Sequence, residues 1–189
     1  MVRVSKAKVA EHRSAILESA SRLFRERGFN DVGVAEIMQA SGLTHGAFYG
    51  HFRSKADLAG AACREACAEG VDNWKHSGDI ATILDRYLSI AHRDNPARGC
   101  ALGAFAGDIA RQGPELQSDY AEAVERFRGV IEHHLTDNEP EARRRKATTI
   151  LATMVGALTM ARGIATADPA LSAAILDNVR LQLRACFGV

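Results

Sequence analysis

The stretch Thr44–Lys55 combines groups that can bind an anion or read a base edge with two aromatic residues at helical spacing. Phe48 and Phe52 lie four residues apart, so on a helix they share one face, which can be buried. Each glycine costs a helix about 1 kcal/mol relative to alanine. Two glycines within five residues therefore indicate a function, and the interpretation that we favour is a recognition helix for DNA. The face opposite the aromatics carries hydrogen-bonding and small side chains: His45, Gly46, Ala47, Tyr49, Gly50, His51 and Lys55.

Short helices and turns frame this stretch. Val34–Ala40 is compatible with a helix, and the turn Ser41–Leu43 separates it from Thr44, whose residue type suits a helix N-cap. The free N–H groups that follow an N-cap can hold a phosphate. Further on, Ser54 and Asp57 form an S-x-x-D capping box at the start of a long helix. Helix, turn and helix in this order predict a helix-turn-helix unit, whose second helix lies in the DNA major groove.

The first third of the chain, roughly, resembles the signature of TetR-type (TetR/AcrR) transcriptional regulators. The matching motifs are Gly28-Phe29, Val34-Ala35-Glu36-Ile37 and the run from Ser41 to Leu58. The resemblance implies a dimeric repressor that binds a palindromic DNA operator and is released by an unknown small-molecule effector. By position, it implies phosphate contacts by Thr44, Tyr49, His51 and Lys55, and base-facing positions for His45, Gly46, Ala47 and Gly50.

The chain departs from the family pattern just before Val34. Where the family often has a threonine followed by serine or threonine, this chain has Val32-Gly33, which removes hydroxyl contacts to phosphate. Gly33 still offers its backbone N–H, and we expect Glu36 to serve as the N3 partner of that cap.

Charge and composition agree with a DNA-binding end and a helical body. The net charge is +1, but residues 1–60 hold nine Lys/Arg against six Asp/Glu. Arg3, Lys6 and Lys8 either reach neighbouring phosphates or form a solvated tail. Four cysteines without paired spacing and the lack of an apolar N-terminal run favour a reducing, cytoplasmic location. The uncharged run from Ala147 to Ala161 is shorter than the ~20 residues of a membrane span, so we expect a buried helix and no membrane contact.

The prolines divide the rest of the chain into helices. Pro96, Pro114, Pro140 and Pro169 all occupy plausible first positions of helices, where their missing N–H is tolerated. The periodicity predicts helices near 79–93, 98–111, 115–136, 140–164 and 169–187, and no strand. We therefore predict an all-α chain with an N-terminal three-helix head (residues 1–55) that binds DNA and a helical body (residues 56–189) for effector binding and dimerisation.

The last two predicted helices are apolar over more than the stripe that one buried face requires. This favours a two-fold, four-helix dimer contact, which the resemblance also implies, over helices that only complete the monomer core. The candidate contact residues are Ile150, Met154, Leu158, Ile175, Val179 and Leu183.

An effector site in the body is implied by the resemblance alone, because these helices carry no motif. The candidate residues that line this site are Trp74, Tyr87, Cys100, Leu102, Phe105, Phe127 and Met154. The alternative for each of them is an ordinary residue of the hydrophobic core. Cys100 raises a second possibility. A thiol at a helix start near Arg98 can have a lowered pKa and react with oxidants or electrophiles, so a redox-responsive repressor is an alternative to a ligand-responsive one. A small buried residue is the other interpretation of Cys100.

A helical enzyme or metal protein is the alternative from another class. Cys63 and Cys67 share a helical face but lack a second ligand pair, so we expect buried apolar residues there. His133 and His134 are adjacent and diverge by about 100° on a helix, so they do not chelate one ion together. The chain shows no nucleophile with a base, no carboxylate pair and no phosphate loop. We expect no enzymatic activity, no metal and no cofactor.

Overall fold

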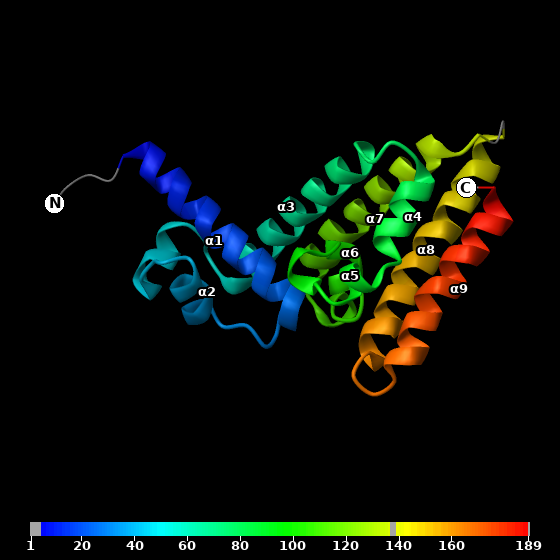
Figure 1. The fold of residues 1–189 in the computed structure, drawn as a ribbon. Coiled ribbons are helices and arrows are strands. Elements are labelled where there is room, and N and C mark those ends of the chain that lie inside the picture. The colour runs from blue at the N-terminus through cyan, green and yellow to red at the C-terminus, as the bar shows by residue number, and fades with distance from the viewer. Residues whose placement is uncertain (1–4, 137–138, 189) are drawn as a thin grey trace.

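The computed structural model describes residues 5–136 and 139–188, and helices make up the regular structure of this part (Figure 1). The predicted all-α class is confirmed. The α-helices are α1 (Lys6–Arg27), α2 (Val34–Ala40), α3 (Lys55–Lys75), α4 (Ile80–Tyr87), α5 (Ile90–Arg93), α6 (Ala101–Phe105), α7 (Pro114–His134), α8 (Pro140–Ile164) and α9 (Pro169–Phe187). Three short 3₁₀ helices are η1 (His45–Gly50), η2 (Pro96–Arg98) and η3 (Ile109–Arg111).

Local capping sets most helix starts. The Ser54 hydroxyl accepts a hydrogen bond from the Asp57 N–H at the start of α3, as the predicted capping box requires. The Asp57 carboxylate in turn accepts from the Arg53 N–H, one residue before the position that a capping box would use. All four prolines lie at the start of a helix, and α8 and α9 have the predicted bounds.

Two predicted helices are wrong in length. The segment predicted as 79–93 is broken after α4, because Ser89 acts as an N-cap and starts α5 by accepting from the His92 N–H. The segment predicted as 98–111 contains η2, α6 and η3 instead of one helix. At the start of this segment the backbone of Gly99 lies close to Arg162 and His92, because a Cβ on Gly99 would lie 2.8 Å from each of them. The first break follows from a local cap and the second is accompanied by close tertiary contacts at Gly99, and helical periodicity reports neither.

One apolar core runs from the head into the body. In the head, Phe48 and Phe52 are buried with ring centroids 5.9 Å apart, as their spacing predicted. Phe29, in the turn after α1, lies 5.2 Å from Phe24 and 4.6 Å from Phe105 of α6. The head therefore packs directly onto the body through aromatic rings.

The body places α8 and α9 side by side at the end of the molecule opposite the head (Figure 1). By length and composition alone, α8 is apolar enough to cross a membrane. In the structure it packs against α7 and α9, and a helix that enters a protein core needs the same composition. Its inward residues, all buried as the apolar run predicted, are Ala147, Ile150, Leu151, Met154, Ala157, Leu158 and Ala161.

Candidate nucleic-acid interface and effector cavity

The recognition segment is shorter and more tightly wound than an α-helix. We define it as Thr44–Lys55. Only His45–Gly50 is helical, as the 3₁₀ helix η1, before α3 begins at Lys55. The Ala47 N–H donates to the Thr44 carbonyl at 3.0 Å and the His51 N–H to the Phe48 carbonyl at 2.9 Å, which is three-residue spacing. The predicted helix is therefore one short 3₁₀ helix followed by a turn.

Buried aromatics on one side of this segment leave polar groups on the other. With Phe48 buried beneath it, Tyr49 is 69% exposed, and His45 is exposed with its ring 6.2 Å from the Tyr49 ring. Thr44 occupies the N-cap position, as predicted, yet its hydroxyl makes no capping hydrogen bond. Thr44, His45 and Tyr49 thus present hydrogen-bonding groups to solvent.

Nothing in the folded chain requires glycine at positions 46 and 50. Both residues are exposed, and a Cβ built on either would meet no atom within 4 Å. By contrast, Ala47 between them is half-buried and packs against the core. Glycine also lowers helix propensity, and contacts among the described residues do not account for glycine at either position.

The other two predicted phosphate contacts, His51 and Lys55, are half-buried and contact other parts of the chain. The His51 side chain is half-buried beside His12, with ring centroids 6.1 Å apart. Burial, followed by the nearby His12 and Arg13, lowers the pKa of His51, so its ring is neutral near pH 7 and offers a hydrogen bond rather than a charge. The Lys55 ammonium donates to the Asn30 carbonyl at 3.3 Å, which links the start of α3 to the turn after α1.

Sequence reasoning missed Arg53 and misjudged Glu36. The Arg53 side chain is 92% exposed next to the recognition segment, with Asp57 at 3.7 Å as its ion-pair partner. The sequence places Arg53 two residues before Lys55, and this proximity could have indicated Arg53 as a further candidate for contact with DNA. Glu36 accepts a hydrogen bond from Arg27, so it ties α2 to α1, and Gly33 begins α2 without a side-chain cap.

The basic N-terminal residues are only partly described. Lys6 and Lys8 are exposed on the first turn of α1, and Lys8 pairs with Glu11 at 3.0 Å. Arg3 lies outside the described residues.

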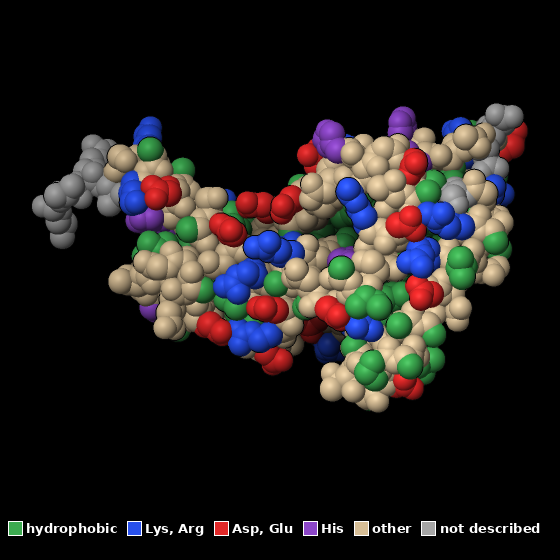
Figure 2. Space-filling model, in the orientation of Figure 1, with side chains coloured by type: hydrophobic (Ala, Val, Ile, Leu, Met, Phe, Trp, Pro, Cys, Tyr) green, Lys and Arg blue, Asp and Glu red, His purple; other side chains and the backbone are tan. Residues whose placement is uncertain are grey.

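A cavity of about 780 Å³ opens where α1, α3 and α4 meet the segment around η2. Figure 2 shows the molecule hollowed here, with both basic and acidic side chains at the rim. Of the predicted effector residues, Trp74, Tyr87 and Cys100 line this cavity. Leu102, Phe105, Phe127 and Met154 are instead fully buried core residues that do not line it. Sequence reasoning missed the cavity's arginines, Arg22, Arg25, Arg86 and Arg98, since they come from three separate segments.

Cys100 does not have the lowered pKa that its position suggested. Burial raises the pKa of its thiol and outweighs the opposing influence of nearby backbone N–H groups, Tyr87 and Arg162. Its own N–H donates to His92 Nε2 at 2.9 Å, while His92 Nδ1 lies 2.8 Å from the Tyr87 carbonyl. The histidine therefore carries its proton on Nδ1, and burial lowers its pKa. A largely protonated thiol is a poor nucleophile.

The exposed apolar face of α8 and α9 differs from the predicted one. Ile150, Met154, Leu158 and Leu183 are buried inside the chain, so the prediction that they form a dimer contact is wrong. Ile175 and Val179 are half-buried. A helical period of 3.6 places other residues outward, and the large exposed hydrophobic ones are Met160, Leu171 and Leu181, at 57%, 52% and 62% exposure.

No metal-binding cluster is formed by the described residues: none of their His, Cys, Asp and Glu side chains come together in a group of three or more. Cys63 and Cys67 are buried on α3, as expected. A hydrogen bond with Cys63, and then burial, raises the pKa of the Cys67 thiol. Both cysteines act as small core residues.

An exposed second helix after a tight turn, fixed on a small aromatic core, defines a helix-turn-helix DNA-binding protein. Residues 16–62 match the family of bacterial regulatory proteins called tetR, and residues 77–174 match the C-terminal domain of LmrA/YxaF-like transcriptional regulators. The second match alone covers more than half of the chain. The chain therefore belongs to the TetR family of transcriptional regulators and is not an enzyme.

Individual relatives agree with this assignment. The chain is 43% identical to the HTH-type transcriptional regulator AcrR of Shigella flexneri over 58 residues, which cover 31% of this chain and 27% of AcrR. The regulator LmrA of Bacillus subtilis is 25% identical over 161 residues, or 77% of this chain and 82% of LmrA. A TetR regulator from Chloroflexus aurantiacus has a similar structure, with a TM-score of 0.77, 25% identity and 95% coverage of both chains. The matches to AcrR and three further relatives span 27% to 40% of those proteins.

Proposed function

We propose that this protein is a dimeric transcriptional repressor that binds a palindromic operator and is released by a small-molecule effector. The observation that carries the proposal is the recognition segment, with its open glycines beside the exposed Thr44, His45 and Tyr49. A backbone without side chains can approach base edges in the major groove, while the hydroxyls bind phosphate. The proposed base-facing residues are His45, Gly46, Ala47 and Gly50, and the proposed phosphate contacts are Thr44, Tyr49, His51 and Lys55.

The proposed dimer interface is the outer face of α8 and α9. Met160, Leu171 and Leu181 are three of the six large hydrophobic side chains exposed in the described part of the chain, and all lie on this helix pair. Small residues such as Ala152 and Gly163, both exposed on α8, allow close helix approach. Two-fold packing of this face gives a four-helix contact and places two recognition segments on one DNA duplex.

Leu181→Asp tests this interface. A carboxylate at the centre of an apolar helix contact is left without a partner, so we expect a monomer in sedimentation velocity and weak operator binding. Gln117→Glu, exposed on α7 and outside this face, is the matched charge control. A dimer of wild-type stability for Leu181→Asp would exclude this face.

Coupling between effector and DNA is proposed to pass through α1. This helix packs on α2 in the head, and on α3, α6 and η2 behind it, so it belongs physically to both proposed domains, 1–55 and 56–189. An effector that favours a different position of α1 shifts the population away from the DNA-binding state. We propose that the protein acts in the cytoplasm, where its operator lies.

Selection from random duplex DNA with purified protein, followed by footprinting, tests the proposed function. We expect enrichment of a palindrome whose half-sites lie about one helical turn apart. Enrichment of a single half-site would contradict the dimeric arrangement. Binding that depends on salt but not on sequence would remove the base-reading role of the recognition segment.

A further inference from the structure

The cavity between α1, α3 and α4 has an excess of positive charge. Four arginines line it, Arg22, Arg25, Arg86 and Arg98, against two acidic residues, Glu18 and Glu69. Arg22 pairs with Glu26 at 3.7 Å, while Arg86 and Arg98 are exposed and form no ion pair within the described residues. Such a lining attracts an anion by its summed field as well as by direct contact.

Arg25 is the arginine best placed to hold that anion. It is half-buried, and its Nη1 makes one long hydrogen bond of 3.4 Å to the Gly99 carbonyl. Its buried Nε has no hydrogen-bond partner among the described residues. Burial lowers the pKa of Arg25, and Glu69 opposes this from beyond ion-pair distance. A buried guanidinium N–H without an acceptor is costly, and an oxyanion would satisfy it with two parallel hydrogen bonds.

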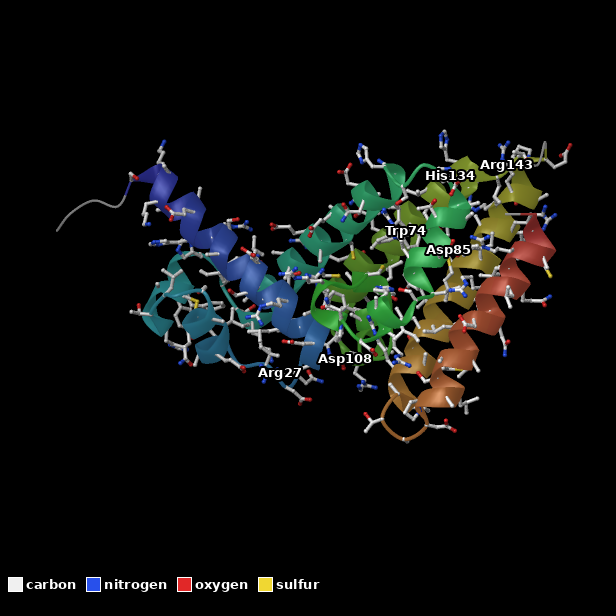
Figure 3. All side chains as sticks on the ribbon, in the orientation of Figure 1. Arg27, Trp74, Asp85, Asp108, His134 and Arg143 are labelled. Carbon is white, nitrogen blue, oxygen red and sulfur yellow. The ribbon has the colours of Figure 1, made fainter. Side chains whose placement is uncertain are left out.

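The cavity lining also includes apolar and aromatic side chains from α3 and α4. Trp74 and Tyr87 meet edge to face with centroids 5.6 Å apart, and Ile83 and Ala66 also line the cavity. Figure 3 shows Trp74 near the end of α3, beside α4. The volume of about 780 Å³ is within the range of small-molecule sites, so it accommodates an organic body beside the charged group.

We propose that the cavity binds an amphipathic organic oxyanion, whose charged group pairs with Arg25 while its apolar body packs against Trp74 and Tyr87. The inference rests on the proposed function, because it names the chemical class of the effector. It also gives a route for release. Arg22 and Arg25 lie on α1, so a ligand that draws them toward α3 and α4 acts on the helix that carries the head.

The single tryptophan of the chain provides the measurement, because Trp74 lines the cavity. The probes are decanoate and cyclohexylacetate, which do not absorb with tryptophan, each compared with its neutral primary amide. We expect both carboxylates to change Trp74 fluorescence saturably, with at least tenfold tighter binding than the amides. Inorganic phosphate, which lacks an apolar body, should bind at least tenfold more weakly than either carboxylate.

Variants assign the charge partner. Arg25→Gln should weaken carboxylate binding at least tenfold while amide binding stays the same. Arg98→Gln, at an exposed position that the fold does not need, should weaken it severalfold and serves if Arg25→Gln folds poorly. Arg145→Gln, exposed on α8 and outside the cavity, is the matched control. Equal affinity for amide and carboxylate, no binding of either carboxylate, or unchanged binding in both Arg25→Gln and Arg98→Gln would overturn the proposal.

DNA binding measured in parallel separates this inference from the proposed function. Fluorescence anisotropy with the selected palindrome should show release by carboxylate and none by amide. Palindrome binding without any carboxylate response at Trp74 would overturn the inference and leave the repressor intact. A Trp74 response in a protein that binds no palindrome would overturn the repressor and leave the oxyanion site. Carboxylate binding that leaves DNA bound would exclude the ligand as effector.

Discussion

The recognition segment and the cavity show opposite relations between sequence and chemistry. The recognition segment is one run, Thr44–Lys55, in which buried Phe48 and Phe52 alternate with exposed groups. The cavity takes Arg25 from α1, Trp74 from α3 and Arg98 from η2. A contiguous site is visible as a local pattern, while an assembled site is visible only after packing. α1 lines the cavity through Arg25 and contacts the recognition segment through His12 and Arg13, so each region can affect the other.

We expect the largest effect on operator affinity from a substitution at Gly46, in the recognition segment. Gly46→Val adds bulk where the folded chain has open space, so thermal unfolding should be unchanged. Operator affinity should fall at least a hundredfold, about 2.8 kcal/mol, because the side chain keeps the backbone from the base edges. Gly129→Val, at an equally open glycine of α7, should bind DNA normally. Normal operator binding by Gly46→Val would show that the backbone at Gly46 does not approach the base edges.

Loss of one side-chain contact of the recognition segment should change DNA affinity about tenfold. Tyr49→Phe and Lys55→Ala should weaken binding to all sequences, and Lys55→Ala should reduce the salt slope by about 1. His45→Ala should change the preferred base at one position instead. Anisotropy titrations against the selected operator and against a scrambled duplex separate these outcomes, and identical behaviour of all three variants would contradict the assigned roles.

Tyr120→Phe is the matched control for Tyr49→Phe. The Tyr120 hydroxyl donates to the Leu102 carbonyl at 3.0 Å inside the body. Its loss should lower the free energy of unfolding by about 1 kcal/mol without changing DNA affinity, whereas Tyr49→Phe should do the reverse.

Asp108 tests the link between the two regions. Its carboxylate accepts from the Phe29 N–H at 2.8 Å and pairs with Arg111 at 3.0 Å, so the body holds the turn that follows α1. Figure 3 shows Asp108 beside the end of α1 that carries Arg27. Asp108→Ala should lower the free energy of unfolding by about 1–3 kcal/mol in urea titrations and reduce the effect of carboxylate on DNA affinity.

The control for Asp108 is Asp177→Ala. Among the described residues, Asp177 pairs with Arg180 in an exposed, same-helix ion pair on α9, and such pairs contribute little to stability. Full coupling between carboxylate and DNA in a destabilised Asp108→Ala protein would show that the link to α1 runs through other contacts.

The smallest expected effect is a pH dependence from the cavity. His92 is neutral, with its lowered pKa caused first by burial. Below its usual pKa of about 6.5 the unfolded chain takes up a proton that the folded chain does not, so stability falls as pH falls. His92→Gln should flatten this fall between about pH 7.5 and 5.5 by about 1 kcal/mol or less, measured by urea unfolding.

The matched control for His92 is the exposed His133→Gln. A remaining slope in His92→Gln is expected from His51, whose pKa is lowered in the head for the same main reason. An unchanged slope in His92→Gln would mean that the buried histidine does not titrate with folding.

Local rules were sufficient for most of the fold. Ser54 and the four prolines mark helix starts by their own hydrogen bonds or their missing N–H, and α8 and α9 have the predicted bounds. The same rules failed at Ser89, where a cap splits the helix predicted for 79–93. They also overestimated η1, because periodicity does not distinguish an α-helix from a 3₁₀ turn.

The sequence by itself determined the all-α class, the helix-turn-helix unit and the exposed positions of Thr44, His45 and Tyr49, because these follow from residue spacing within a few turns of chain. Only the tertiary structure decided which apolar residues of α8 and α9 remain exposed, since Met154 and Met160 look alike until the packing of α8 against its neighbours buries Met154. Tertiary structure also decided the pKa direction at Cys100, because burial outweighed the helix start and the arginine that its sequence context suggested. The arginine-lined cavity likewise exists only where distant segments pack together.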